Sequence, residues 1–166
     1  GTLQYSALFE TTRMHSNCLD VNDDGEAFLL RWAPWIDFST PKSLHSVVKL
    51  KNDGTGITDS ISFVFSQDTS WSWWTWDFKI DKEENIYLCG HVDKPLIQAS
   101  LNAFQQSYNG NTDGFIVKTD PSGNNLLYAT YIGGTAYDDA KNIIIEPNGM
   151  IAAAGITGSA DFPVKG

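Results

Sequence analysis

Four short apolar runs that follow one another between residues 113 and 166 constrain the fold more than any other feature of this sequence. Each run has the length of a β-strand, and residues that favour tight turns separate the runs. Asp120–Asn124 contains Pro121 and Gly123, which suit the second position and the positive-φ position of a turn. Asn148-Gly149 predicts a two-residue type I′ hairpin, in which both central residues have positive φ. The segment therefore predicts a four-stranded antiparallel sheet.

Earlier parts of the chain repeat this unit at fixed spacings. A shift of 65 residues aligns 61–90 with 126–155 without a gap, and a shift of 124 aligns 19–38 with 143–162. A shift of 123 aligns Leu3–Phe9 with Leu126–Ile132, and a shift of 69 aligns HSVVKLK at 45–51 with GFIVKTD at 114–120. The chain thus contains three copies of one unit, the first without its opening strand.

Repeated four-stranded units are typical of a β-propeller, in which each sheet packs face to face on the next. The expected fold is all-β, with β-propeller blades formed by three consecutive four-stranded antiparallel sheets, the first lacking its inner strand. One partial propeller covers residues 1–166, with blade one at 1–40, blade two at 41–97 and blade three at 98–166. The inner strands are expected at 45–51 and 114–120, and the shifts predict eleven strands in total.

The third copy resembles the bacterial seven-bladed β-propeller repeat (SBBP-like). The resemblance rests on DGFIVKTDPSGNNLLYATYIGG at 113–134, Asp138-Asp139, DFP at 161–163 and NAFQ at 102–105. The second copy matches only at its strands, and the first mainly at Asp24-Gly25 and Asp37-Phe38. The resemblance implies blades of a propeller in a secreted or surface-attached bacterial protein, and it carries no catalytic residues. An extracellular or bacterial cell-surface location is therefore expected.

Blade number and charge limit the partners that this chain can have. A closed propeller usually has four to eight blades, so three blades predict a piece of a longer polypeptide or a half-propeller that pairs with a second copy. The partners expected at the open edges are other blades of a longer chain or another protein. The formal charge of −9 disfavours nucleic acid, because that partner requires basic residues at its phosphates. No apolar run approaches the roughly 20 residues of a membrane-spanning helix, so membrane insertion is not expected.

Aromatic residues are the candidates for binding. Trp74, Trp76, Phe78 and Ile80 alternate, which predicts one inward-facing stripe on a strand. Trp71 and Trp73 fall outside that stripe and are predicted to be accessible, either to a glycan or to a protein partner. The alternative is that the whole tryptophan cluster packs between blades. The predicted binding residues are Trp71, Trp73, Trp35 and Tyr137.

Other polar motifs favour structural roles. Asp138, Asp139 and Asp161 could in principle serve acid–base chemistry, but their repeat positions favour hydrogen bonding to loop N–H groups. Asp20–Gly25 resembles a calcium-binding loop, yet Arg31 stands where a glutamate ligand belongs, so a hairpin turn is the favoured interpretation. His15 and Cys18 have no second pair at zinc spacing. No metal or cofactor is expected.

The sequence favours a protein without catalytic activity. Cys18 and Cys89 lie at non-equivalent positions of different copies, so no disulfide is expected. We expect an extracellular scaffold or binding module that belongs to a larger secreted or cell-surface β-propeller protein and mediates protein or glycan contacts. The alternative is a fragment of a carbohydrate-active propeller enzyme.

Overall fold

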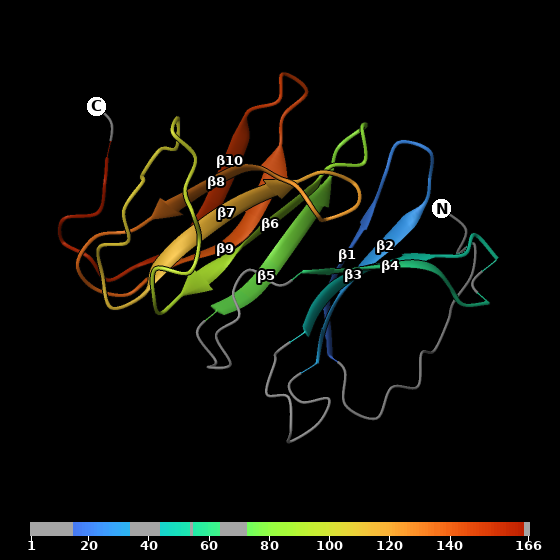
Figure 1. Cartoon of the computed structure of the whole chain (residues 1–166), viewed down its shortest axis with the longest axis horizontal. Helices are drawn as coiled ribbons and strands as arrows, with labels where there is room; N and C mark the ends of the chain where they lie inside the picture. Colours follow the sequence, from blue (N-terminus) through green and yellow to red (C-terminus); the bar gives the residue numbers. More distant parts are fainter. Residues whose placement is uncertain (1–14, 34–43, 54, 64–72, 165–166) are drawn as a thin grey trace.

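The computed structural model describes residues 15–33, 44–53, 55–63 and 73–164, which form ten β-strands and no helix (Figure 1). The strands are β1 (His15–Val21), β2 (Ala27–Ala33), β3 (Leu44–Leu50), β4 (Ile57–Phe63), β5 (Trp73–Ile80), β6 (Ile86–Val92), β7 (Asp113–Thr119), β8 (Leu126–Ile132), β9 (Asp138–Ile145) and β10 (Ile151–Thr157). They form sheets of four, four and two strands, in the orders β1-β2-β3-β4, β5-β6-β7-β8 and β9-β10. The predicted all-β fold of antiparallel sheets is confirmed. The eleventh predicted strand, Leu3–Phe9, lies outside the described residues.

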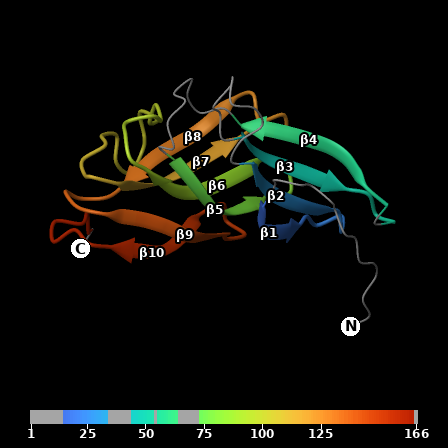
Figure 2. The same ribbon diagram turned by 90° about the horizontal axis from the view of Figure 1, so that it is seen from below.

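The sheets pack face to face, as consecutive propeller blades do (Figure 2). One hydrophobic core joins the first two sheets, with Val47 of β3 and Phe115 of β7 among its buried residues. A second core joins the second and third sheets and includes Ile116 of β7 and Ile143 of β9. Strand β1 contacts β5, and β5 contacts β9. The first strands of successive sheets are therefore neighbours, an arrangement expected of strands that surround a propeller axis.

Two aspartates connect the first strands across the sheet boundaries. Asp20 of β1 accepts a hydrogen bond from the backbone N–H of Ile80 in β5, with a donor–acceptor distance of 2.8 Å. Asp77 of β5 accepts one from the backbone N–H of Ile143 in β9, at 3.1 Å. An edge strand leaves some backbone donors without a partner in its own sheet, and each carboxylate satisfies one of them. The sheets are thus held together by polar contacts as well as by apolar packing.

The strands are grouped differently from the sequence expectation. HSVVKLK at 45–51 and GFIVKTD at 114–120 were expected to begin blades as inner strands. They overlap β3 and β7, which are the third strands of their sheets. The short connection at 133–137 passes from β8 to a new sheet, whereas the long connection at 93–112 joins paired strands β6 and β7. The incomplete sheet among the described residues is consequently the last one, with two strands, and not the first. The repeat length is the same whichever strand is taken as the first of a blade. The alignment therefore contained no information on which strands share a sheet.

The hairpins β1–β2, β5–β6, β7–β8 and β9–β10 have turns of the same geometry. Gly123 N–H donates to the Asp120 carbonyl at 3.0 Å, and Gly149 N–H donates to the Glu146 carbonyl at 2.8 Å. Gly123 and Gly149 have φ of +72° and +82°, whereas Asn148 does not have positive φ. The tight turn predicted at Asp120–Asn124 is confirmed. The type I′ turn predicted at Asn148-Gly149 is wrong, because only the glycine is left-handed, as in a type I turn followed by a positive-φ residue.

The first hairpin uses the same turn at Asn22–Gly25. Gly25 N–H donates to the Asn22 carbonyl at 3.0 Å, and Gly25 has a φ of +80°. The Asn22 side-chain oxygen accepts a hydrogen bond from the backbone N–H of Glu26 at 2.9 Å. Asp20 is directed to Ile80 of the second sheet, as described above. The hairpin-turn interpretation of this acidic segment is therefore the one that the structure shows.

The turn between β5 and β6 has glutamate where the other three have glycine. Glu84 has a φ of +60°, a region that costs a residue with a Cβ atom about 1–2 kcal/mol. We expect Glu84→Gly to raise the free energy of unfolding by about 1 kcal/mol, measured by urea denaturation. The ion pair that Glu84 makes with Lys49, at 3.3 Å, is partly exposed and contributes little. Glu84→Ala is the control, because it removes the ion pair and keeps the strained backbone. An equal gain in both variants would show that backbone strain is not the cause.

Candidate functional site

The structure places the predicted binding residues in different environments. Trp35 and Trp71 lie outside the described residues. Trp73 is only 6% exposed and belongs to the core between the first two sheets, where its ring centroid lies 3.8 Å from that of His45. Tyr137 is 42% exposed on the connection between β8 and β9. The prediction that Trp73 is accessible is therefore corrected, whereas Tyr137 is accessible.

A β-bulge in β5 explains why the tryptophan pattern was misinterpreted. Thr75 pairs with Gly90, but Asp77 pairs with Cys89, so Trp76 is an extra residue in the strand. An extra residue reverses the alternation of faces, and it therefore separates Trp74 from the buried side chains of Phe78 and Ile80. Trp73 takes the inward position instead, and Trp74 and Trp76 are only half-buried.

Glycines opposite the bulge could have revealed it in the sequence. A Cβ atom at Gly90 would collide with the backbone carbonyl of Trp74, and one at Gly155 would collide with the carbonyl of Asp139. Gly90 and Gly155 are repeat equivalents at the shift of 65, and β9 has its own bulge at Lys141, the equivalent of Trp76. A glycine inside a strand often indicates a bulge or a close backbone approach. This signal was not used in the sequence analysis.

The half-buried tryptophans surround a buried carboxylate. Asp139 Oδ2 accepts hydrogen bonds from Trp76 Nε1 at 3.0 Å and from the Tyr137 hydroxyl at 2.9 Å. Lys141 Nζ lies 2.6 Å from the same oxygen, and His91 Nδ1 lies 3.0 Å from it. These groups come from β5, β6, β9 and the connection before β9. One carboxylate oxygen therefore joins polar groups of the second and third sheets, in addition to the hydrophobic core between them.

The electrostatics of this cluster favour the ionised form of Asp139 and the protonated form of Tyr137. Burial alone would raise the pKa of Asp139, but hydrogen bonds from His91 and Lys141 outweigh it and hold that pKa below its usual value. Burial and the hydrogen bond to the Asp139 carboxylate raise the pKa of Tyr137 to about 12. Asp139 is consequently ionised, and the Tyr137 hydroxyl remains a donor.

The aromatic surface, which we define as Trp74, Trp76 and Tyr137, lies around this carboxylate, and the buried ring of His91 lies beside it. The Trp74 and Trp76 rings are nearly parallel, at an interplanar angle of 15° with centroids 6.3 Å apart. The His91 and Tyr137 rings lie 5.7 Å apart, and Lys141 Nζ lies 3.5 Å from the Trp76 ring centroid. Ring faces combined with polar edges suit stacking on a ligand together with hydrogen bonding.

The remaining acidic candidates have structural contacts. Asp138 Oδ2 accepts hydrogen bonds from the Gly134 backbone N–H at 2.7 Å and from the Ser159 hydroxyl at 2.6 Å. Asp161 Oδ1 accepts from the backbone N–H and the hydroxyl of Thr135, both at 3.0 Å. Both aspartates therefore tie the connection before β9 to the segment after β10. These contacts match the structural role that their repeat positions predicted.

Cys18 and Cys89 are both free thiols. Burial, followed by the nearby charge of Asp77, raises the pKa of Cys18 and of Cys89 to about 12. Within the ranges that the structure describes, no three His, Cys, Asp or Glu side chains gather in a way that could hold a metal ion. In the same ranges, no helix is long and apolar enough to cross a membrane.

Comparison with known proteins found no match for this sequence among protein-family models or among curated proteins. The resemblance to the bacterial propeller repeat therefore stays a prediction. The function has to be argued from the contacts, burial and charge of the residues themselves.

Proposed function

We propose that this chain is a non-catalytic binding module, part of a larger secreted or cell-surface bacterial β-propeller protein, and that its aromatic surface binds a glycan. The observation that carries the proposal is the pair of nearly parallel, half-buried rings of Trp74 and Trp76 beside the exposed Tyr137. Planar rings give a large contact area at a low cost in conformational entropy, which suits the apolar faces of sugar rings. The proposed location rests on the repeat resemblance.

The carboxylates near this surface support binding more than catalysis. A carbohydrate-active enzyme needs a carboxyl group that reaches the scissile bond and exchanges a proton there. The side chain of Asp139 is fully buried, and its Oδ2 already faces four polar groups. Asp138 is fully buried and bonded to Gly134 and Ser159. Both carboxylates therefore make buried contacts that stabilise the fold.

The charge of the chain also bears on its ligand. With a formal charge of −9, the protein repels polyanions at moderate ionic strength. A neutral or cationic glycan avoids this repulsion, and hydrogen bonds to the Tyr137 hydroxyl or the Lys141 amine can fix its orientation. A protein partner at the same rings is the alternative outcome of the experiment below.

Truncation of the aromatic surface tests the proposal. We expect Trp74→Ala and Tyr137→Ala each to weaken glycan binding by about 2 kcal/mol, which is typical of an aromatic hot spot. The measurement is a glycan screen followed by calorimetry on the hits. Phe104→Ala is the matched control, because Phe104 is also 42% exposed but lies on the connection between β6 and β7.

The same preparation distinguishes the alternatives. Glycan cleavage by the unmodified chain would favour the enzyme interpretation, and binding that all three variants retain would place the site elsewhere. Enrichment of a protein, without any glycan hit, would assign the aromatic surface to protein contacts.

A further inference from the structure

The edge of β10 that faces away from β9 has no paired strand among the described residues. At the shift of 65, β10 is the repeat equivalent of β6, and β6 lies between β5 and β7. All seven residues of β6 are buried, whereas every residue of β10 from Ala152 to Thr157 is exposed. The same repeat position is thus a central strand in one sheet and an edge strand in the other.

The protein covers the edge of β8, in the neighbouring sheet, with its own backbone. Along β8, Ser100 N–H donates to the Ala129 carbonyl at 2.9 Å, and Tyr131 N–H donates to the Gln105 carbonyl at 3.1 Å. The Ser100 hydroxyl in turn accepts a hydrogen bond from Ala129 N–H at 2.9 Å. The connection between β6 and β7 therefore satisfies the edge of β8. No described segment does the same for β10, although exposed strand edges normally need such protection.

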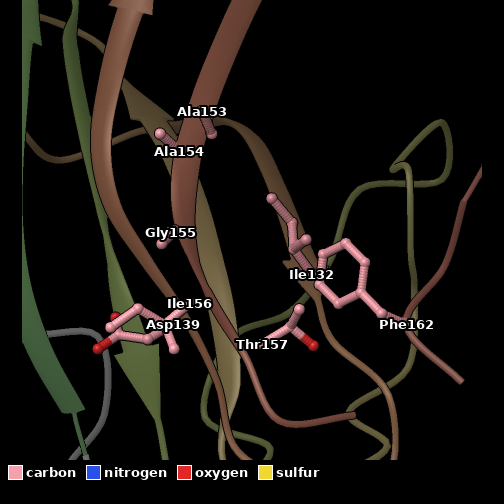
Figure 3. Close-up of a pocket in the computed structure, with 9 residues that line it drawn as sticks. Ile132, Asp139, Ala153, Ala154, Gly155, Ile156, Thr157 and Phe162 are labelled. Atoms are coloured by element: carbon pink, nitrogen blue, oxygen red, sulfur yellow. The ribbon is translucent and has the colours of Figure 1, made fainter. Parts of the chain in front are cut away.

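A cavity lies beside this open edge (Figure 3). It has a volume of about 220 Å³ and is lined by Ile132 of β8, by β10 from Ala153 to Thr157, and by Phe162, together with Asp139 and Ala140 of β9. In the first two sheets, the third and fourth strands of one sheet pack against those of the other. Val47 of β3 and Phe63 of β4 belong to the same core as Phe115 of β7 and Tyr131 of β8. By the same stacking, strands added beyond β10 would cover Ile132 and fill the cavity.

The side chains of β10 are small where those of β6 are larger. Ala153 and Ala154 are the repeat equivalents of Leu88 and Cys89. In the second sheet, Leu88 pairs with Val117, and Cys89 pairs with Ile116. In the first sheet, Leu29 and Leu30 likewise pair with Val48 and Val47. A strand added to β10 would therefore place branched aliphatic side chains opposite Ala153 and Ala154. The small alanine side chains leave space for these larger ones.

We propose that the free edge of β10 binds a β-hairpin of this repeat's third- and fourth-strand type, in which the first strand of the hairpin pairs antiparallel with β10. The occupant resembles β7–β8, with two adjacent branched aliphatic residues followed by lysine, as in Ile116-Val117-Lys118 and Val47-Val48-Lys49. A second copy of this chain is a poorer occupant, because its β3–β4 and β7–β8 hairpins already pair with β2 and β6. The proposal rests on the multi-blade architecture proposed above and not on glycan binding.

The experiment supplies such a hairpin at the repeat spacing. Gly166 aligns with Leu101 at the shift of 65, so a second copy of residues 102–132 appended directly after Gly166 continues the repeat. Hydrogen–deuterium exchange is then measured at the backbone amides of Ala152–Ile156. We expect alternate amides in this range to exchange at least roughly tenfold more slowly than in the unmodified chain, because they gain hydrogen bonds to the added strand.

The matched control carries proline at the appended equivalent of Val117. Proline has no N–H donor and does not fit a central strand, so the slow exchange should disappear. Unchanged exchange in the extended chain, or equal protection in the proline control, would overturn the proposal. Protection of β10 in the unmodified chain that grows with protein concentration would instead identify a second copy as the occupant.

A second experiment tests the proposal even if the extended chain does not fold. A synthetic peptide of residues 102–132 is added to the unmodified chain, and the same amides are followed by exchange. Slower exchange that saturates with peptide supports the proposal, and no change at millimolar peptide contradicts it. Glycan binding measured on these samples is a separate readout, so failure of strand addition and failure of the aromatic surface are distinguishable.

Discussion

Trp73→Ala is expected to lower the free energy of unfolding by about 3–5 kcal/mol, the usual cost of truncating a buried tryptophan. Trp73 begins β5 and packs in the core between the first two sheets, against the ring of His45. Removing the indole would leave a cavity beside this histidine, and burial already lowers the pKa of His45 to about 3. Urea denaturation at pH 7 measures the loss.

Trp74→Ala is the matched control for this prediction. Trp74 is the next residue of the same strand but lies on the other face, half-buried near Trp76. Its truncation should cost distinctly less, because solvent already reaches part of the ring. Equal losses in the two variants would mean that the bulge at Trp76 does not separate the faces as described. The sequence pattern had predicted the opposite order, with Trp73 accessible and Trp76 in the inward stripe.

Asp139→Ala is expected to cost about 3–5 kcal/mol, the usual loss when one partner of a buried ion pair is removed. Its carboxylate is the acceptor for Trp76 and Tyr137 and the counter-ion of Lys141. Without the carboxylate, these groups are still partly removed from water but have lost their hydrogen-bonding partner. The contact between the second and third sheets then weakens. Thermal and urea unfolding measure the loss. Asp161→Ala is the control and should cost distinctly less, because its carboxylate is exposed and its hydrogen bonds to the backbone N–H and the hydroxyl of Thr135 compete with water.

The contribution of Asp139 also has a defined pH dependence. Its pKa is held below the usual value in the folded protein, so the unfolded chain binds a proton at this group more readily than the folded chain. The stabilisation is therefore complete above about pH 4, the usual pKa of aspartate, and is lost as the pH falls through the lowered pKa. The difference in unfolding free energy between the unmodified chain and Asp139→Asn should narrow below pH 4. His45 is present in both proteins, so its titration cancels in this difference.

The positions of the strands and of their turns could be predicted from the sequence. Apolar runs of strand length and turn residues such as Pro121 and Gly123 act locally, so they predict β-strands wherever they occur. The repeat spacing of 65 extended this prediction to Ile61–Gly90 and indicated that several similar sheets pack together. These local features predicted an all-β fold. The repeat added that the sheets stack, because each four-stranded unit needs its neighbours to bury its apolar faces.

Only the tertiary structure decided which strands share a sheet and which side chains meet. Hydrogen bonds between β6 and β7 cross a long connection, and a repeat spacing does not say which strand begins a blade. A single extra residue at Trp76 reverses the faces of β5, so Trp73 is in the core and Trp76 meets Asp139. The cluster at Asp139 draws its members from three strands and a connection, and their approach depends on how two sheets pack. Periodicity describes one strand at a time, whereas contacts between sheets depend on the path of the whole chain.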